Sequence, residues 1–124
     1  MKPGDTFPDG QPIIGEGNIW LKTVGGTSEN GNIPTVYLPK NQFTTTASVT
    51  FYENESTDLF WLYLDGIFVK VCSVAFISSE DLYTEDYRCA EAGTHRVDVV
   101  QYTNGDPTQP AVLHRVFYYK MIRT

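Results

Sequence analysis

Apolar and polar residues alternate with a period of two over several stretches of this chain. In residues 46–53, Ala47, Val49 and Phe51 share one face of an extended backbone, and Ser, Thr and Tyr residues occupy the other. Residues 111–122 repeat the pattern with Leu113, Phe117, Tyr119 and Met121 on one face. Such alternation indicates strands with one face in a core. No segment carries a sustained apolar stripe of helical period, so no long helix is predicted.

Two runs rich in β-branched and aromatic residues flank the dipeptide Asp65-Gly66. Residues 59–64 are apolar at almost every position, which predicts a central strand covered on both faces and places Trp61 inside it. Residues 67–77 form the second run. An Asp-Gly pair between two such runs predicts a two-residue hairpin turn of type I′, because that turn needs positive φ at both central positions.

Further strands are predicted at residues 18–24, at 34–39 and at 94–102. The second of these begins and ends with proline, which restricts it to a sheet edge. Residues 78–81 read Ser-Ser-Glu-Asp, a capping pattern that supports at most one helical turn. A strand could then resume over residues 83–89. The total of about seven or eight strands, with turn signals roughly every ten residues, predicts an all-β antiparallel sandwich.

Residues 1–17 differ in composition from the remainder of the chain. Prolines and glycines interrupt this segment at seven positions: Pro3, Gly4, Pro8, Gly10, Pro12, Gly15 and Gly17. Such a composition predicts an extended N-terminal arm. Residues 18–124 then form a single sandwich domain, which suits a chain of 124 residues. The arm lacks the apolar h-region of a secretory signal peptide. We therefore expect either a protein made without a signal peptide or the mature domain of a secreted one.

Composition and charge narrow the classes of partner. The chain has 9 basic and 15 acidic residues and a net charge of −6, without the clustered Lys and Arg that phosphate contacts need, so nucleic acid is disfavoured. No apolar run approaches the roughly 20 residues of a membrane-spanning helix. Charged residues are only 19% of the chain, and a surface rich in Thr, Ser and Asn is common in extracellular and virion β-proteins.

Little in the sequence points to catalysis. The two histidines, His95 and His114, are the only ready general bases. His95 alternates with Val97 and Val99, which places it at a sheet margin, and it is interpreted as a hydrogen-bonded structural histidine. His114 is interpreted as a surface residue of the last strand. An enzyme would need His95 close to a carboxylate in a cleft. No nucleophile elbow, phosphate-binding loop or dinucleotide fingerprint is present, so we expect neither an enzyme nor a cofactor.

The cysteines and the acidic residues offer weaker candidates. Cys72 and Cys89 match no zinc spacing. They are candidates for a disulfide if their strands are neighbours, although Cys72 could equally be a small buried thiol. The carboxylates within residues 80–86 could gather around calcium, but without a recognised ligand spacing solvated loop carboxylates are the better interpretation.

The second half of the chain, over residues 34–122, resembles an immunoglobulin-like sandwich of the broad bacterial and viral kind that includes PKD-type domains. Residues 61–66 (Trp-Leu-Tyr-Leu-Asp-Gly) are similar to the family's Trp-containing third strand and its following turn. Residues 93–105 resemble the Gly-Thr-Tyr-x-Val-x-Val stretch of its final hairpin. Tyr-Arg-Cys89 is similar to the Tyr-x-Cys of antibody domains, but Cys72 is too close in sequence to be the usual partner. The resemblance implies a fold and no functional residues.

Aromatic residues are the most informative functional feature. Tyr and Trp give rigid, amphipathic contact area and are enriched at interfaces. The candidate binding aromatics are Trp20, Tyr52, Tyr83 and Tyr102. We therefore expect a non-enzymatic binding or assembly module, either a virion structural component (a phage capsid decoration or fibre protein) or a surface adhesion domain. It would act on a protein partner or on itself, in a virion or outside the cell. The alternative is a carbohydrate-binding module for a cell-surface glycan.

Overall fold

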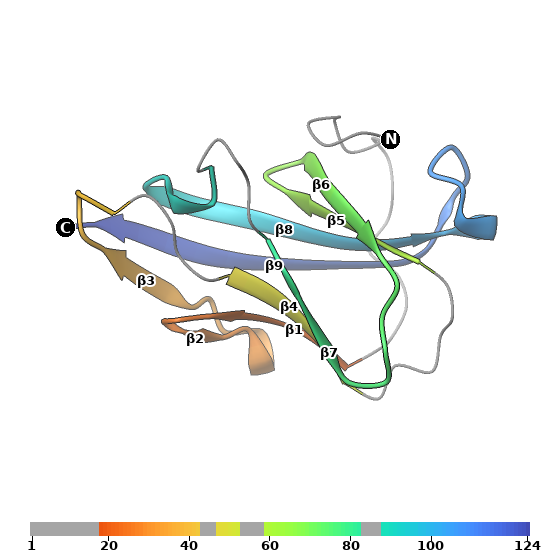
Figure 1. Cartoon of the computed structure of the whole chain (residues 1–124), viewed down its shortest axis with the longest axis horizontal. Helices are drawn as coiled ribbons and strands as arrows, with labels where there is room; N and C mark the ends of the chain where they lie inside the picture. Colours follow the sequence, from red (N-terminus) through yellow and green to blue (C-terminus); the bar gives the residue numbers. More distant parts are fainter. Residues whose placement is uncertain (1–17, 43–46, 53–58, 83–87) are drawn as a thin grey trace.

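Two β-sheets packed face to face make up the structure (Figure 1). The computed structural model describes residues 18–42, 47–52, 59–82 and 88–124. In strand order, the four-stranded sheet contains β2 (Gly26–Thr27), β1 (Asn18–Thr23), β4 (Ala47–Tyr52) and β7 (Ser78–Asp81). The five-stranded sheet contains β3 (Thr35–Leu38), β9 (Ala111–Arg123), β8 (Gly93–Tyr102), β5 (Phe60–Leu64) and β6 (Ile67–Cys72). The predicted all-β sandwich is confirmed; the proposed arm, residues 1–17, lies outside the described residues.

Among the described strands, pairing is antiparallel with one exception. Edge strand β3 runs parallel to β9, with Val36 opposite Met121. The prolines at positions 34 and 39 predicted an edge strand, and β3 is one. Its parallel partner, more than 70 positions away in the sequence, was not predicted, because a pairing between distant segments leaves no local signal.

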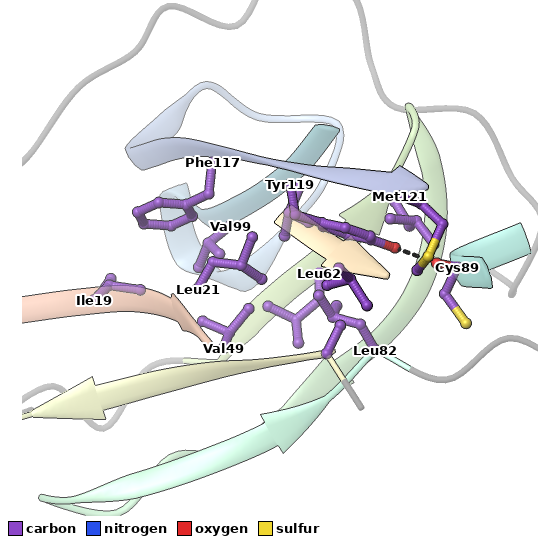
Figure 2. Packing of buried hydrophobic residues seen from close by; sticks show 14 of the residues in the cluster. Ile19, Leu21, Val49, Leu62, Leu82, Cys89, Val99, Phe117, Tyr119 and Met121 are labelled. Atoms are coloured by element: carbon purple, nitrogen blue, oxygen red, sulfur yellow. Dashed lines mark hydrogen bonds between the residues drawn. The ribbon is translucent and has the colours of Figure 1, made fainter. Parts of the chain in front are cut away.

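The main core lies between the two sheets (Figure 2). Inward side chains of β1 and β4, such as Leu21 and Val49, meet Leu62, Val99 and Phe117 from the five-stranded sheet. The inward residues predicted for the last strand are all in this core: Leu113, Phe117, Tyr119 and Met121. The alternation read from the sequence therefore identifies the faces of β4 and β9 correctly.

A second, smaller cluster lies on the outward face of the five-stranded sheet. It consists of Trp61, Tyr63, Phe68, Val100, Tyr102 and Ala111. Because β5 sends Leu62 into the main core and Trp61 and Tyr63 into this cluster, every residue of β5 is buried. β5 also lies between β6 and β8. The prediction of a central strand covered on both faces is confirmed.

The turn between β5 and β6 has the predicted geometry. Asp65 and Gly66 have φ angles of 53° and 79°, and the residues on either side, Leu64 and Ile67, pair directly. Positive φ at both central positions is the requirement of a type I′ turn. A β-bulge then shifts the register of the hairpin between Leu62 and Tyr63.

Replacing Gly66 by valine should lower the free energy of unfolding by about 1 kcal/mol or more, because a β-branched residue resists positive φ. A Cβ at position 66 would meet no other atom within 4 Å, so the cost is conformational and not a clash. Denaturant titration measures it. Gly66→Asn is the matched control and should cost less, since asparagine tolerates this region. Equal, negligible costs for both variants would contradict the assignment of strain to this position.

Two local predictions were wrong. Residues 78–81 form strand β7 and not a helical turn, because their backbone pairs with β4 and the hydroxyls of Thr50 and Ser79 lie 3.0 Å apart. Of the strand predicted over residues 83–89, residues 83–87 lie outside the described residues, and its end at Cys89 was wrong, because Cys89 belongs to the short 3-10 turn Arg88–Ala90. For residues 78–81, pairing with β4 outweighed a weak local signal.

Candidate functional site

His95 fastens the β5–β6 turn to the start of β8. Its Nδ1 lies 2.7 Å from Asp65 Oδ2, and its Nε2 lies 2.7 Å from the carbonyl oxygen of Glu91. The other oxygen of Asp65 accepts a hydrogen bond from the backbone N–H of Arg96 at 2.9 Å. His95 is hydrogen-bonded, as predicted. It is also buried, and neither its burial nor its partners were foreseen.

The contacts of His95 determine its protonation. Both ring nitrogens face oxygen acceptors, so the ring meets both bonds only as an imidazolium that donates twice. Burial by itself lowers the pKa of His95, but the hydrogen bonds to Asp65 and Glu91 outweigh it and raise the pKa above its ordinary value. The ring also stacks on Tyr119, with centroids 4.8 Å apart, which suits a cation. His95 does lie beside a carboxylate, and both of its ring nitrogens are engaged in hydrogen bonds within the protein.

This arrangement makes stability depend on pH in a definite direction. Since the pKa of His95 is raised on folding, its contribution to stability is complete below the unfolded value of about 6.5 and is lost as the pH rises through the folded value. The difference in unfolding free energy between the wild type and His95→Gln should therefore shrink as pH increases above about 6.5. Urea titrations across neutral and alkaline pH measure this difference. A gap that is constant or widens with pH would show that His95 is not held as a cation.

A second charged group is buried on the outward face of the five-stranded sheet. Arg96 donates from Nε to Asp98 Oδ1 at 2.9 Å and from Nη2 to Oδ2 at 3.0 Å. His114 Nε2 lies 2.6 Å from the same Oδ2. Asp98 and His114 are each only 1% exposed. The interpretation of His114 as a surface residue was therefore wrong, because its neighbours on β8 supply a buried carboxylate.

Tyr102, one of the candidate binding aromatics, is buried in the same region. Its hydroxyl lies 2.6 Å from that of Tyr63, and its ring meets Trp61 edge-on at 5.3 Å. Burial raises the pKa of both phenols, and the charge of Asp98 raises them further, so both stay neutral. Tyr102 therefore cannot present its ring to a partner, and its assignment as a binding residue is corrected.

The two cysteines are free thiols, and the expected disulfide between them is not formed. Cys72 is half-buried in β6 and donates to the carbonyl of Phe60 at 3.7 Å. Burial, reinforced by the charge of Glu80, raises the pKa of Cys72 to about 11. Cys89 is buried in the main core, where its carbonyl accepts a hydrogen bond from Tyr119 (Figure 2). Because its pKa is raised, the thiol of Cys72 stays protonated near neutral pH and is a poor nucleophile.

The titratable groups described above have structural roles. Asp65 and Asp98 each accept several hydrogen bonds from residues of β8 or β9, and these two carboxylates were missed in the sequence. A signal did exist for Asp98, because Arg96 and Asp98 are two positions apart in a strand and therefore share one face of it. Sequence alone does not reveal that this face is covered.

Trp20 and Tyr52 are the candidate aromatics that the fold brings together. Both lie on the outward face of the four-stranded sheet, since their neighbours Ile19, Leu21 and Phe51 point into the core. Trp20 pairs with Thr50, two residues before Tyr52 on β4, so the two rings are diagonal neighbours. Tyr52 is 41% exposed and Trp20 is half-buried. Tyr83 lies outside the described residues.

We define the Trp20 face as the outward side chains of this sheet: Trp20, Lys22, Ser48, Thr50, Tyr52, Ser79 and Asp81. Ser48 and Thr50 are nearly buried, so the taller side chains around them form the surface that a partner would meet. Just before β7, Phe76 and Ile77 are 55% and 63% exposed. Because Ser78 pairs with Phe51, the two exposed residues precede β7 at the same end of the sheet as Tyr52.

Among the described residues, no group of three or more His, Cys, Asp or Glu side chains could hold a metal ion. No helix in that part of the chain is long and apolar enough to cross a membrane. Comparison of the chain with protein-family models, curated proteins and solved structures found no match.

Proposed function

We propose that this protein is a non-enzymatic binding and assembly module that contacts a protein partner through the Trp20 face. The observation that carries the proposal is the placement of Trp20 and Tyr52 on one face of the four-stranded sheet, near the exposed side chains of Phe76 and Ile77. The absence of catalysis is supported by the engagement of His95, Asp65 and Asp98 in internal hydrogen bonds. An immunoglobulin-like topology is supported by the β5–β6 hairpin lying beside the final β8–β9 hairpin in one sheet.

The sheet edges support contact through a face. Each described edge strand carries a feature that hinders pairing with another chain. β2 has only two residues, β3 lies between two prolines, and β7 carries two adjacent acids. The pairing of β6 with β5 contains a bulge, and Lys70 Nζ of β6 lies 2.9 Å from Glu80 Oε2 of β7. Because strand addition is hindered at these edges, the outward faces are the surfaces better suited to a partner.

The composition of the Trp20 face favours protein over sugar. A sugar-binding platform uses exposed aromatic rings flanked by hydrogen-bonding groups, and Trp20 and Tyr52 beside Ser79 would serve as one. Exposed Ile77, in contrast, has neither a hydrogen-bonding group nor an aromatic ring for a sugar and is typical of the apolar centre of a protein interface. A carbohydrate-binding module is therefore the second candidate. An assembly module of this kind would suit a virion structural component or a surface adhesion domain.

Site-specific photocrosslinking tests the proposal. A photoreactive phenylalanine derivative is placed at Tyr52, or at Tyr37 as a control, which is 67% exposed on the other sheet. Crosslinking is carried out in the cells or particles that naturally contain the protein, and adducts are identified by mass spectrometry. We expect a defined protein adduct from position 52 and not from position 37. A glycan array that binds the wild type, but not Trp20→Ala, would instead select the carbohydrate candidate.

A further inference from the structure

We propose that the partner on the Trp20 face is a second copy of this chain, related by a twofold axis that runs parallel to β4. This inference rests on the proposed function, because it uses the same face. It is carried by a second observation, the placement of two opposite charges on that face.

Lys22 and Asp81 occupy one row across the sheet. Ser48 pairs with Lys22 on one side and with Asp81 on the other. Lys22 points outward because Leu21 and Thr23 are buried, and Asp81 points outward with Ser79, whose hydroxyl meets that of Thr50. Both charged side chains are exposed. From β1 through β4 to β7, the row therefore consists of a positively charged, a small polar and a negatively charged side chain.

This row is self-complementary under one choice of axis. A twofold rotation about a line along β4 places β1 of one copy over β7 of the other. It leaves each cross-strand row of residues at the same position along the direction of β4. Lys22 of one copy then faces Asp81 of the other, and the symmetry makes this contact twice. An axis across the strands would instead move Lys22 and Asp81 to the opposite end of the partner's face. Charge complementarity therefore selects the axis along β4.

The same operation also matches the apolar groups. Tyr52 lies on β4, close to the axis, and so meets its own copy. Ile77 and Phe76 precede β7, which is brought over β1 of the second copy, and so reach the surroundings of Trp20. Two sheets that pack in this aligned way cross at about 30° because of their twist, which the long Lys22 side chain can accommodate. The contact thus has an aromatic centre and two reciprocal ion pairs at its flanks.

Charge reversal gives a decisive test by sedimentation equilibrium of the full chain. We expect concentration-dependent dimers for the wild type. Lys22→Asp and Asp81→Lys should each weaken dimerisation about 100-fold or more, since each places like charges together at two contacts. An equimolar mixture of the two variants should dimerise again, because every contact in the mixed dimer joins opposite charges. Lys120→Asp, an exposed lysine on the other sheet, is the matched control and should behave as the wild type.

Two outcomes would overturn the inference. One is a wild type that stays monomeric at its highest soluble concentration, and the other is a mixture that associates no better than its components. Circular dichroism of each variant shows whether it is folded, so a loss of dimer is not confused with unfolding. A monomeric wild type that still crosslinks from position 52 to another protein would leave the proposed function standing and reject only the homodimer.

Discussion

Replacing Trp61 by alanine is expected to lower the free energy of unfolding by about 3–5 kcal/mol, the usual cost of removing a large aromatic side chain from a packed site. Trp61 is only 6% exposed. Its ring packs edge-on against Tyr102, and its Cη2 atom lies 3.9 Å from the place that a Cβ would occupy at Gly105. The turn after β8 therefore closes over the indole, and truncation would leave a cavity. Denaturant titration followed by circular dichroism measures the loss.

Trp20→Ala is the control for this experiment. Trp20 is half-buried on the other sheet, so its removal should cost much less. In a Trp20→Phe background Trp61 is the only indole, and its emission should be blue-shifted in the folded state and move to the red on unfolding. A cost below about 1 kcal/mol, or emission at the fully hydrated wavelength, would place Trp61 at the surface and contradict the second cluster.

Replacing Asp98 by asparagine is expected to cost about 2–4 kcal/mol, because it removes one partner of a buried ionic group and leaves the donors without an anion. Asp98 accepts two hydrogen bonds from Arg96 and lies 2.6 Å from His114. Asparagine keeps the shape but replaces one acceptor oxygen with a donor. The cost lies below that of a fully enclosed pair, because the side chain of Arg96 is 45% exposed and therefore screened by water.

Glu29→Gln provides the comparison for an exposed carboxylate and should change stability by no more than about 0.5 kcal/mol. A double-mutant cycle of Asp98→Asn with Arg96→Met then separates the ion pair from the contribution of His114. If Asp98→Asn proves as mild as Glu29→Gln, the cluster on the outward face is more hydrated than its burial indicates, and its role in holding β8 against β9 is refuted.

Features encoded by neighbouring residues were determined by the sequence itself. The alternation in residues 46–53 and 111–122 depends only on the geometry of an extended chain, so it identified the inward faces of β4 and β9. Asp65-Gly66 specified its turn because few residue pairs accept two positive φ angles in succession. The apolar residues of β5 likewise predicted burial on both faces. In each case the physical cause acts within a few residues, and a single sequence is enough to read it.

Features that depend on segments distant in sequence were decided only by the tertiary structure. Tyr102 and His114 follow strand patterns that suit a surface as well as an interior, and it is the covering of one face of the five-stranded sheet that buries them. Residues 78–81 became a strand because β4 offered hydrogen-bond partners, against their own preference for a helix cap. Trp20 and Tyr52 came together through the register of β1 with β4. Strand partners and sheet coverage arise from long-range packing, and no local pattern in this chain encodes them.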